Sequence, residues 1–169
     1  MDYKYYERKI NDIIMKCPIE AGVEILVYNL VDEFINYAEL SLVDINRIRK
    51  NSDERLTTDS GVPDIAILSD DFVFNTNLGK VWGFVEVKAP NQELYEGVQS
   101  FFHKKETNNY LYTNGLVWKY YNNSKLEWEV YLTTKELLFQ SVFEKISISA
   151  EAFEILCNKL KHIKWTTIN

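Results

Sequence analysis

Two short sequence patterns contain the residue types from which a metal-dependent site is built. Asp64 follows Pro63 at the start of one apolar run, and Glu86 and Lys88 lie at the end of another. Side chains alternate along a strand, so Glu86 and Lys88, two positions apart, are expected on the same face. If the two runs are neighbouring strands, Asp64 joins them at one edge of the sheet.

The chemistry available to these three side chains is that of a divalent cation beside a phosphate. Two carboxylates, completed by carbonyl oxygens and water, form the shell that Mg²⁺ prefers when it also binds phosphate. A cation there neutralises a phosphodiester and lowers the pKa of a bound water. The ammonium of Lys88 would orient that water or stabilise developing negative charge. The alternative is a turn dipeptide at one strand start and an exposed charge pair at another strand end.

The elements that must position these residues are a mixture of helices and strands. Apolar positions at helical spacing predict a short helix over Tyr6–Cys17 and a second helix from Ile19 to about Ala38. Residues 40–60 fit either a strand or a broken helix, followed by a solvated loop. Short β-rich runs between turn residues predict strands at 65–68, 81–87, 110–112, 116–121 and 126–132, with 72–74 as a candidate for one more.

Further helical patterns follow the second strand and close the chain. Helical spacing recurs from Leu94 to Lys105, a capping box begins at Thr133, and an amphipathic segment covers Ala152–Ile163. Thr113-Asn114-Gly115 is a strong hairpin signal between two strands. The order predicts a mixed α/β (α+β) fold with one sheet and helices packed on it, in a single domain spanning residues 1–169.

Composition and cysteine usage exclude several classes of protein. With 46% hydrophobic and 26% charged residues, the 169-residue chain is neither disordered nor fibrous. It has no apolar run long enough to span a bilayer and no signal-peptide pattern at its start, so we expect a cytoplasmic protein without membrane contact. Cys17 and Cys157 are far apart and are expected to be reduced, buried thiols. A zinc site is disfavoured because only His103 and His162 could join them.

The net charge of −6 has the wrong sign for a protein that depends mainly on phosphate attraction. Contact with nucleic acid would need a local basic face, a bound cation or a partner. The candidate basic residues, which are otherwise ordinary surface charges, are Arg47, Arg49, Lys50, Arg55, Lys104, Lys105, Lys119 and Lys125. If they converge on one face, they would contact the phosphate backbone without reading bases.

Four stretches stand in a characteristic order along the chain: Gly61–Ile67, Phe84–Pro90, Gln99 and Tyr112–Tyr121. In this order they resemble the PD-(D/E)xK nuclease superfamily, and most closely the restriction-endonuclease-like domains at the N-termini of type I restriction subunits and fused restriction–modification enzymes. The similarity runs from about residue 20 to residue 121. It implies a restriction-endonuclease-like core, with a central mixed β-sheet flanked by helices in an αβββαβ-type order.

The resemblance also implies roles for single residues. Asp64 and Glu86 would be metal ligands, Lys88 the catalytic lysine, and Gln99 the family's active-site glutamine. Many members place a glutamate from the first core helix near the metal. Glu20 and Glu24 share one helix face, and Glu20 fits the family position because it comes just before the apolar run.

The function implied by the resemblance is that of a Mg²⁺-dependent endonuclease, with Mn²⁺ as a substitute, that hydrolyses phosphodiester bonds in restriction or phage defence. DNA is the expected nucleic acid, and a double-strand break would need a homodimer or two visits. The alternatives are a non-catalytic binding or assembly subunit of a restriction or defence complex, and an RNA-directed nuclease.

The sequence departs from the family pattern in three places. His103 stands where several relatives have tyrosine, and serves either as a phosphate contact or general acid, or as a structural residue. An insertion occupies residues 70–79. No helicase, methyltransferase or target-recognition motif is present, so the pattern leaves open what selects the substrate, and a homodimer and partner restriction or defence subunits are both options.

Overall fold

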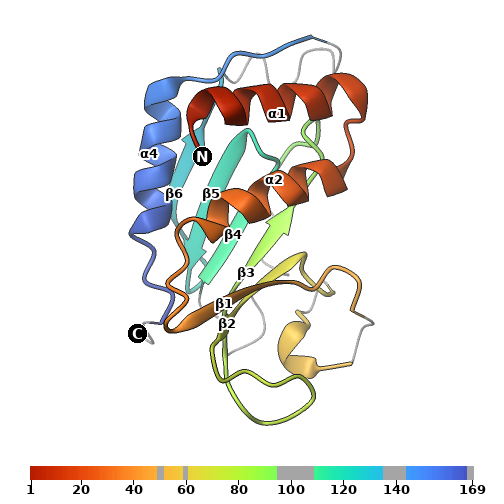
Figure 1. Cartoon of the computed structure of the whole chain (residues 1–169), viewed down its shortest axis with the longest axis vertical. Helices are drawn as coiled ribbons and strands as arrows, with labels where there is room; N and C mark the ends of the chain where they lie inside the picture. The colour runs from red at the N-terminus through yellow and green to blue at the C-terminus, as the bar shows by residue number, and fades with distance from the viewer. Residues whose placement is uncertain (49–51, 59–60, 95–108, 135–143, 167–169) are drawn as a thin grey trace.

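The computed structural model describes residues 1–48, 52–58, 61–94, 109–134 and 144–166. At its centre is a six-stranded sheet in which the strands lie side by side in chain order (Figure 1). The strands are β1 (Leu40–Asp44), β2 (Ile65–Ser69), β3 (Val81–Val87), β4 (Asn109–Thr113), β5 (Val117–Asn122) and β6 (Lys125–Tyr131). The helices are α1 (Tyr3–Lys16), α2 (Glu20–Asp32), the 3-10 turn η1 (Glu54–Leu56) and α4 (Ala150–Lys161).

The sheet is mixed because one neighbouring pair of strands is parallel. β3 and β4 run parallel, whereas the other neighbouring pairs are antiparallel. A parallel pair needs a crossover of about a dozen residues or more, and the chain between Val87 and Asn109 is long enough to supply one. The predicted mixed α/β class is therefore confirmed, and the arrangement is compatible with a restriction-endonuclease-like core. The helix predicted up to Lys105 lies almost entirely outside the described residues.

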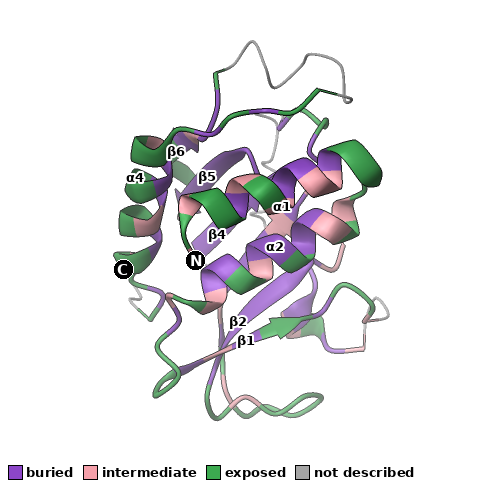
Figure 2. Cartoon of the chain, turned by 45° about the horizontal axis from the view of Figure 1, so that its top comes forward, coloured by how far each residue is buried: buried purple, intermediate pink, exposed green. Residues whose placement is uncertain are grey.

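The helices cover the sheet with their apolar sides. α1 begins at the N-cap Asp2, whose carboxylate accepts a hydrogen bond from the backbone N–H of Tyr5 at 2.9 Å. α1 and α2 lie across one face of the sheet, and α4 stands beside β6 (Figure 1). Figure 2 shows that the strands beneath the helices are buried, and in β4 every residue is buried. The apolar stripe predicted for α2 is therefore the side that packs on the sheet.

The hairpin between β4 and β5 forms where the sequence predicts it. The Asn114 side-chain oxygen accepts hydrogen bonds from the backbone N–H groups of Leu116 and Val117, at 3.0 and 2.9 Å. Gly115 has a φ of +83°, and a Cβ added there would lie 2.9 Å from Cγ1 of Val23 on α2. Glycine is required both for the turn and for the close approach of the helix.

The structure corrects two of the predicted elements and decides between two alternatives for a third. α2 ends at Asp32 rather than near Ala38, because the chain must turn to enter β1. In this turn the backbone carbonyl of Asn36 accepts hydrogen bonds from the backbone N–H groups of Glu39 and Leu40. The segment after residue 40 is a strand rather than a broken helix. Residues 72–74 form no strand, because their backbone is held in a turn.

The turn at residues 72–74 is held by a half-buried ion pair. The Arg55 guanidinium pairs with Asp53 at 2.7 Å, donates to the carbonyls of Val73 and Leu78, and lies 4.1 Å from the Phe72 ring centroid. The Arg55 side chain is therefore used in contacts within the fold.

The cysteines are free, as predicted, but Cys17 is exposed at the end of α1 and Cys157 is half-buried. The prediction that both are buried is wrong for Cys17, because this residue lies in the short link between α1 and α2. Among the described residues, no helix combines the length and the apolar character that a membrane span requires.

Candidate functional site

The pairing of β2 with β3 brings the two predicted carboxylates together. Ile65 lies opposite Val85 in the antiparallel register, so Asp64 stands beside the end of β3. The Asp64 carboxylate accepts a hydrogen bond from the backbone N–H of Val87 at 2.6 Å, and the residue is only 7% exposed. Asp64 is thus fixed to the strand that carries Glu86.

Lys88 connects the strand to the first turn of α2. Its ammonium donates to Glu86 Oε1 at 2.6 Å and to the Val87 carbonyl at 2.9 Å, and lies 3.7 Å from Glu20 Oε2. Glu86 and Lys88 therefore share a face, as strand alternation predicts. The structure brings together Glu20, Asp64, Glu86 and Lys88.

The electrostatics of this cluster show an excess of negative charge. Burial, followed by the charge of Glu86, raises the pKa of Asp64 to about 7. Burial also raises the pKa of Glu86, although its hydrogen bond with Lys88 opposes the shift. Burial by itself would lower the pKa of Lys88, but the hydrogen bond to Glu86 and the nearby acids raise it overall. Three carboxyl groups thus face one ammonium.

The donor atoms at this cluster suit a hard divalent cation. They are carboxylate oxygens and the Val87 carbonyl, the ligand types that Mg²⁺ takes. Within the part of the chain that the structure describes, no group of three or more His, Cys, Asp and Glu side chains is placed to enclose a metal ion. Mg²⁺ commonly binds through one or two carboxylates and keeps its waters, so the residues fit an open site rather than a closed structural one.

The other predicted site residues are not part of this cluster as described. Glu24 is buried and its carboxylate accepts a hydrogen bond from the Asn46 side chain at 2.7 Å. Of the two glutamates on α2, Glu20 is therefore the one beside Lys88. Gln99 and His103 lie outside the described residues.

Tyr112 belongs to the surroundings of the site, although the sequence prediction treated it only as part of the hairpin. The parallel register places Tyr112 opposite Glu86. Burial raises the pKa of Tyr112, the charge of Lys88 opposes this shift, and Glu86 adds to it. Only the register between β3 and β4 could have revealed this neighbour, and local sequence patterns do not contain it.

The predicted basic clusters do not form one free surface among the described residues. Lys119 is buried, with its ammonium 3.2 Å from Glu129 and bonded to the Leu94 carbonyl at 3.4 Å. Arg55 is held by Asp53. Arg47 and Lys125 are exposed, and the remaining members, Arg49, Lys50, Lys104 and Lys105, lie outside the described residues. The interpretation of Lys119 and Arg55 as free surface cations is wrong, because Lys119 is itself buried and pairs with Glu129, and Arg55 pairs with the buried Asp53.

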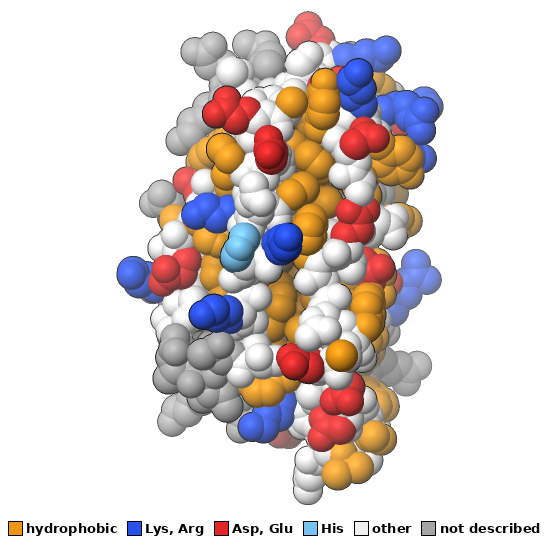
Figure 3. Space-filling view, turned by 60° about the vertical axis from the view of Figure 1, so that its left-hand side comes forward, with side chains coloured by type: hydrophobic (Ala, Val, Ile, Leu, Met, Phe, Trp, Pro, Cys, Tyr) orange, Lys and Arg blue, Asp and Glu red, His pale blue; other side chains and the backbone are white. Residues whose placement is uncertain are grey.

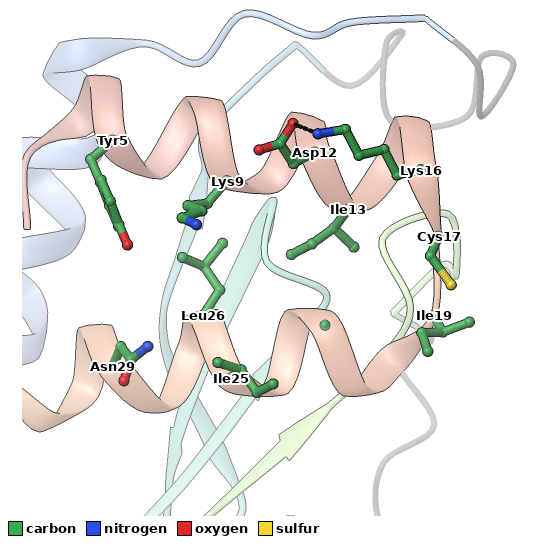
Figure 4. Close-up of a pocket in the computed structure, with 11 residues that line it drawn as sticks. Tyr5, Lys9, Asp12, Ile13, Lys16, Cys17, Ile19, Ile25, Leu26 and Asn29 are labelled. Atoms are coloured by element: carbon green, nitrogen blue, oxygen red, sulfur yellow. Dashed lines mark ion pairs between the residues drawn. The ribbon is translucent and has the colours of Figure 1, made fainter.

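A separate apolar groove lies between α1 and α2 (Figure 4). It has a volume of about 400 Å³, with Ile13 and Leu26 between its walls and Tyr5, Ile19 and Ile25 along them. The Lys16–Asp12 ion pair at its rim, 2.7 Å long, is internal to α1. None of the predicted site residues lines this groove, so it is not part of the carboxylate cluster.

Comparison with known proteins identifies a similar fold. No protein-family model matches the chain, and no curated protein matches it. A chain in the cryo-EM structure of a DrdV–DNA complex is similar to it, with a TM-score of 0.58 and 14% sequence identity over 95% of this chain and 96% of that chain. At this identity the likeness establishes the fold alone.

Proposed function

We propose that this protein is a Mg²⁺-dependent endonuclease of the PD-(D/E)xK type that hydrolyses phosphodiester bonds in DNA. The observation that carries the proposal is the convergence of Asp64, Glu86 and Lys88 at the junction of β2 and β3, in the order along the chain that this superfamily shows. The similar chain in the DrdV–DNA complex supports DNA as the substrate. The proposed role in restriction or phage defence rests on the resemblance of the sequence to the PD-(D/E)xK superfamily.

The excess acid at the site supports a cation there. Asp64 and Glu86 would hold Mg²⁺, with Mn²⁺ as a substitute, and Glu20 would lie beside them as a further carboxylate near the ion. When bound, the ion would supply charge neutralisation and an activated water. Asp64 has to be deprotonated to act as a ligand, and its pKa of about 7 places that change near neutral pH.

The role of Lys88 would be to stabilise the negative charge that develops on the phosphate during hydrolysis. Its ammonium is fixed by Glu86 and by the Val87 carbonyl, so it is preorganised at 17% exposure and does not swing freely in solvent. Preorganised donors in a partly buried site stabilise developing charge on a phosphate more strongly than mobile ones. Glu20, whose side chain is 41% exposed, lies on the solvent side of the cluster.

The test is cleavage of duplex, single-stranded and branched DNA and of RNA in Mg²⁺ or Mn²⁺. Glu86→Gln and Lys88→Gln should each lower the rate at least about 100-fold while circular dichroism shows a retained fold. Glu20→Gln should slow cleavage, whereas Glu24→Gln, four residues away on the same helix, should not. Absence of cleavage with every substrate and both metals would overturn the proposal.

A second function, a non-catalytic binding or assembly subunit, is favoured by two observations. The described residues offer no enclosed group of three metal-binding side chains, and the Lys88 ammonium already pairs with Glu86. Calorimetry with Mg²⁺ and with Mn²⁺ separates the two functions. Binding that Asp64→Asn abolishes supports the nuclease, and no binding at millimolar metal supports the assembly subunit.

A further inference from the structure

A second concave surface lies on the opposite face of the sheet from Glu86. Glu86 is in register with Tyr112 on β4, and Tyr112 with Lys119 on β5. Tyr120 follows Lys119, so strand alternation directs its side chain to the other face. There it lines a pocket of about 570 Å³ together with Trp128 and residues at and after the end of α4. This volume is within the range of sites that bind small organic groups.

The aromatic wall of the pocket is a fixed stacking platform. The rings of Tyr120 and Trp128 stack with centroids 5.4 Å apart and an interplanar angle of 27°. Tyr120 is held by a hydrogen bond from its hydroxyl to the Asn109 side chain at 2.6 Å, and by an edge contact with Trp165 at 6.4 Å. Trp128 is half-buried and lines the pocket. A base stacks on such a ring whatever its identity.

The second wall of the pocket, formed by the end of α4 and the residues after it, is cationic. Lys159, His162 and Lys164 line it, and neither lysine forms an ion pair with any other residue that the structure describes. Glu127 also lines the pocket, but its carboxylate faces Lys125 at 3.7 Å. Figure 3 shows this side of the molecule, with Lys and Arg side chains on either side of a histidine.

Lys164 lies beyond α4, so the charge preference of a helix end does not explain its position. Lysines in the last turn of α4, such as Lys159, suit the helix dipole. Lys164 comes after the end of the helix, and the next residue, Trp165, is buried. The backbone carbonyl of Trp165 accepts a hydrogen bond from the side-chain amide of Asn109 at 2.9 Å. Asn109 therefore forms hydrogen bonds both with Tyr120 of the aromatic wall and with the backbone beside Lys164 of the cationic wall, so it connects the two walls.

We infer that this pocket binds a single strand of DNA, with a base stacked on Trp128 and the adjoining phosphate between Lys159 and Lys164. An aromatic surface and two lysines in one pocket suit a nucleotide unit, and a protein with a net charge of −6 needs such a local site to hold a polyanion. The choice of DNA rests on the proposed function. The pocket is separate from the carboxylate cluster and requires no metal.

The experiment is fluorescence anisotropy of the full chain with labelled oligo(dT), in EDTA so that cleavage is excluded. Trp128→Leu should weaken binding about 10-fold or more. Lys159→Gln with Lys164→Gln should lower the slope of log affinity against log salt by about 1.4, the value for two lost phosphate contacts to a single strand. The matched controls, Phe74→Leu and the pair Lys16→Gln with Lys145→Gln, should leave binding unchanged.

The outcomes separate this inference from the proposed nuclease. Equal binding by wild type, Trp128→Leu and the double lysine variant would overturn it. Binding of thymidine monophosphate but not of oligo(dT) would also overturn it, because the site would then serve a free nucleotide. The double lysine variant keeps the test decisive if Trp128→Leu is poorly folded. Failure of the nuclease would appear instead as intact oligo(dT) binding without cleavage in any metal.

Discussion

Replacing Asp64 with asparagine removes a buried negative charge while keeping the shape of the side chain. Asparagine retains an oxygen that can accept the Val87 N–H, so the contact between the strands survives. In the wild type, burial and the charge of Glu86 raise the pKa of Asp64 from 3.8 to about 7. The folded protein thus keeps a proton over a pH range in which the unfolded chain has released it.

The sign and size of the effect follow from this difference in pKa. Because the folded-state pKa is the raised one, wild-type stability is highest below the unfolded pKa and falls as the pH rises through the folded value. A difference of about 3 pKa units corresponds to about 4 kcal/mol of unfolding free energy. Of this loss, ~2.5 kcal/mol falls between pH 5 and pH 8. Asp64→Asn should therefore gain that much relative to wild type over the same interval.

Urea denaturation of both proteins near pH 5 and near pH 8, in EDTA, measures the effect. The matched control is Asp71→Asn, which removes an exposed aspartate from the turn after β2 and should keep the wild-type pH dependence. Mg²⁺ added near pH 8 should then stabilise the wild type but not Asp64→Asn, because ligand binding to the folded state alone raises its stability.

Parallel pH dependences for wild type and Asp64→Asn would refute the burial argument, because no charge penalty would then be present at this position. A difference in pH dependence without a Mg²⁺ effect would leave the burial argument in place and refute the cation site.

Three further changes test the packing around the site. Lys88→Met removes the ammonium that neutralises Glu86 and should lower the unfolding free energy by about 2 kcal/mol near pH 8, measured by urea denaturation. Asn114→Ala leaves two turn N–H groups and the Gln92 carbonyl without their partner, and should lower the midpoint of urea unfolding by an amount equivalent to about 2 kcal/mol. Gly115→Ala imposes a positive φ on alanine and a clash with α2, and should cost about 2 kcal/mol, measured by thermal unfolding.

Each change has a control within the chain. Lys125→Met removes an exposed lysine from a 3.7 Å pair and should have little effect. Asn77→Ala changes an exposed loop residue, and Gly22→Ala adds a Cβ at a helical position of α2, where its nearest neighbour is the flexible side chain of Ile13 at 3.2 Å, so both should cost less than their partners. If a test variant and its control lowered the unfolding free energy equally, the contacts of Lys88, Asn114 or Gly115 would not contribute the predicted stability.

Local sequence patterns were sufficient to predict most of the elements. The stripe on α2, the β-rich runs of β2 and β3, and the Thr113–Gly115 turn all depend on residues close together in the chain. The same holds for Glu86 and Lys88, whose common face needs only the two-residue repeat of a strand. The end of α2 and the turn at 72–74 were predicted wrongly, because both depend on what the chain meets next in space.

The tertiary structure decided which charged side chains meet. Asp64 reaches Glu86 only through the register of β2 with β3, and Tyr112 only through that of β3 with β4. Lys119 and Arg55 look like surface cations in the sequence, but in the structure Lys119 is buried and pairs with Glu129, and Arg55 pairs with the buried Asp53. Burial and strand register arise from contacts between residues far apart in the chain. A linear sequence therefore indicates which groups are available for chemistry, and the packed sheet determines which of them share a site and at what pKa.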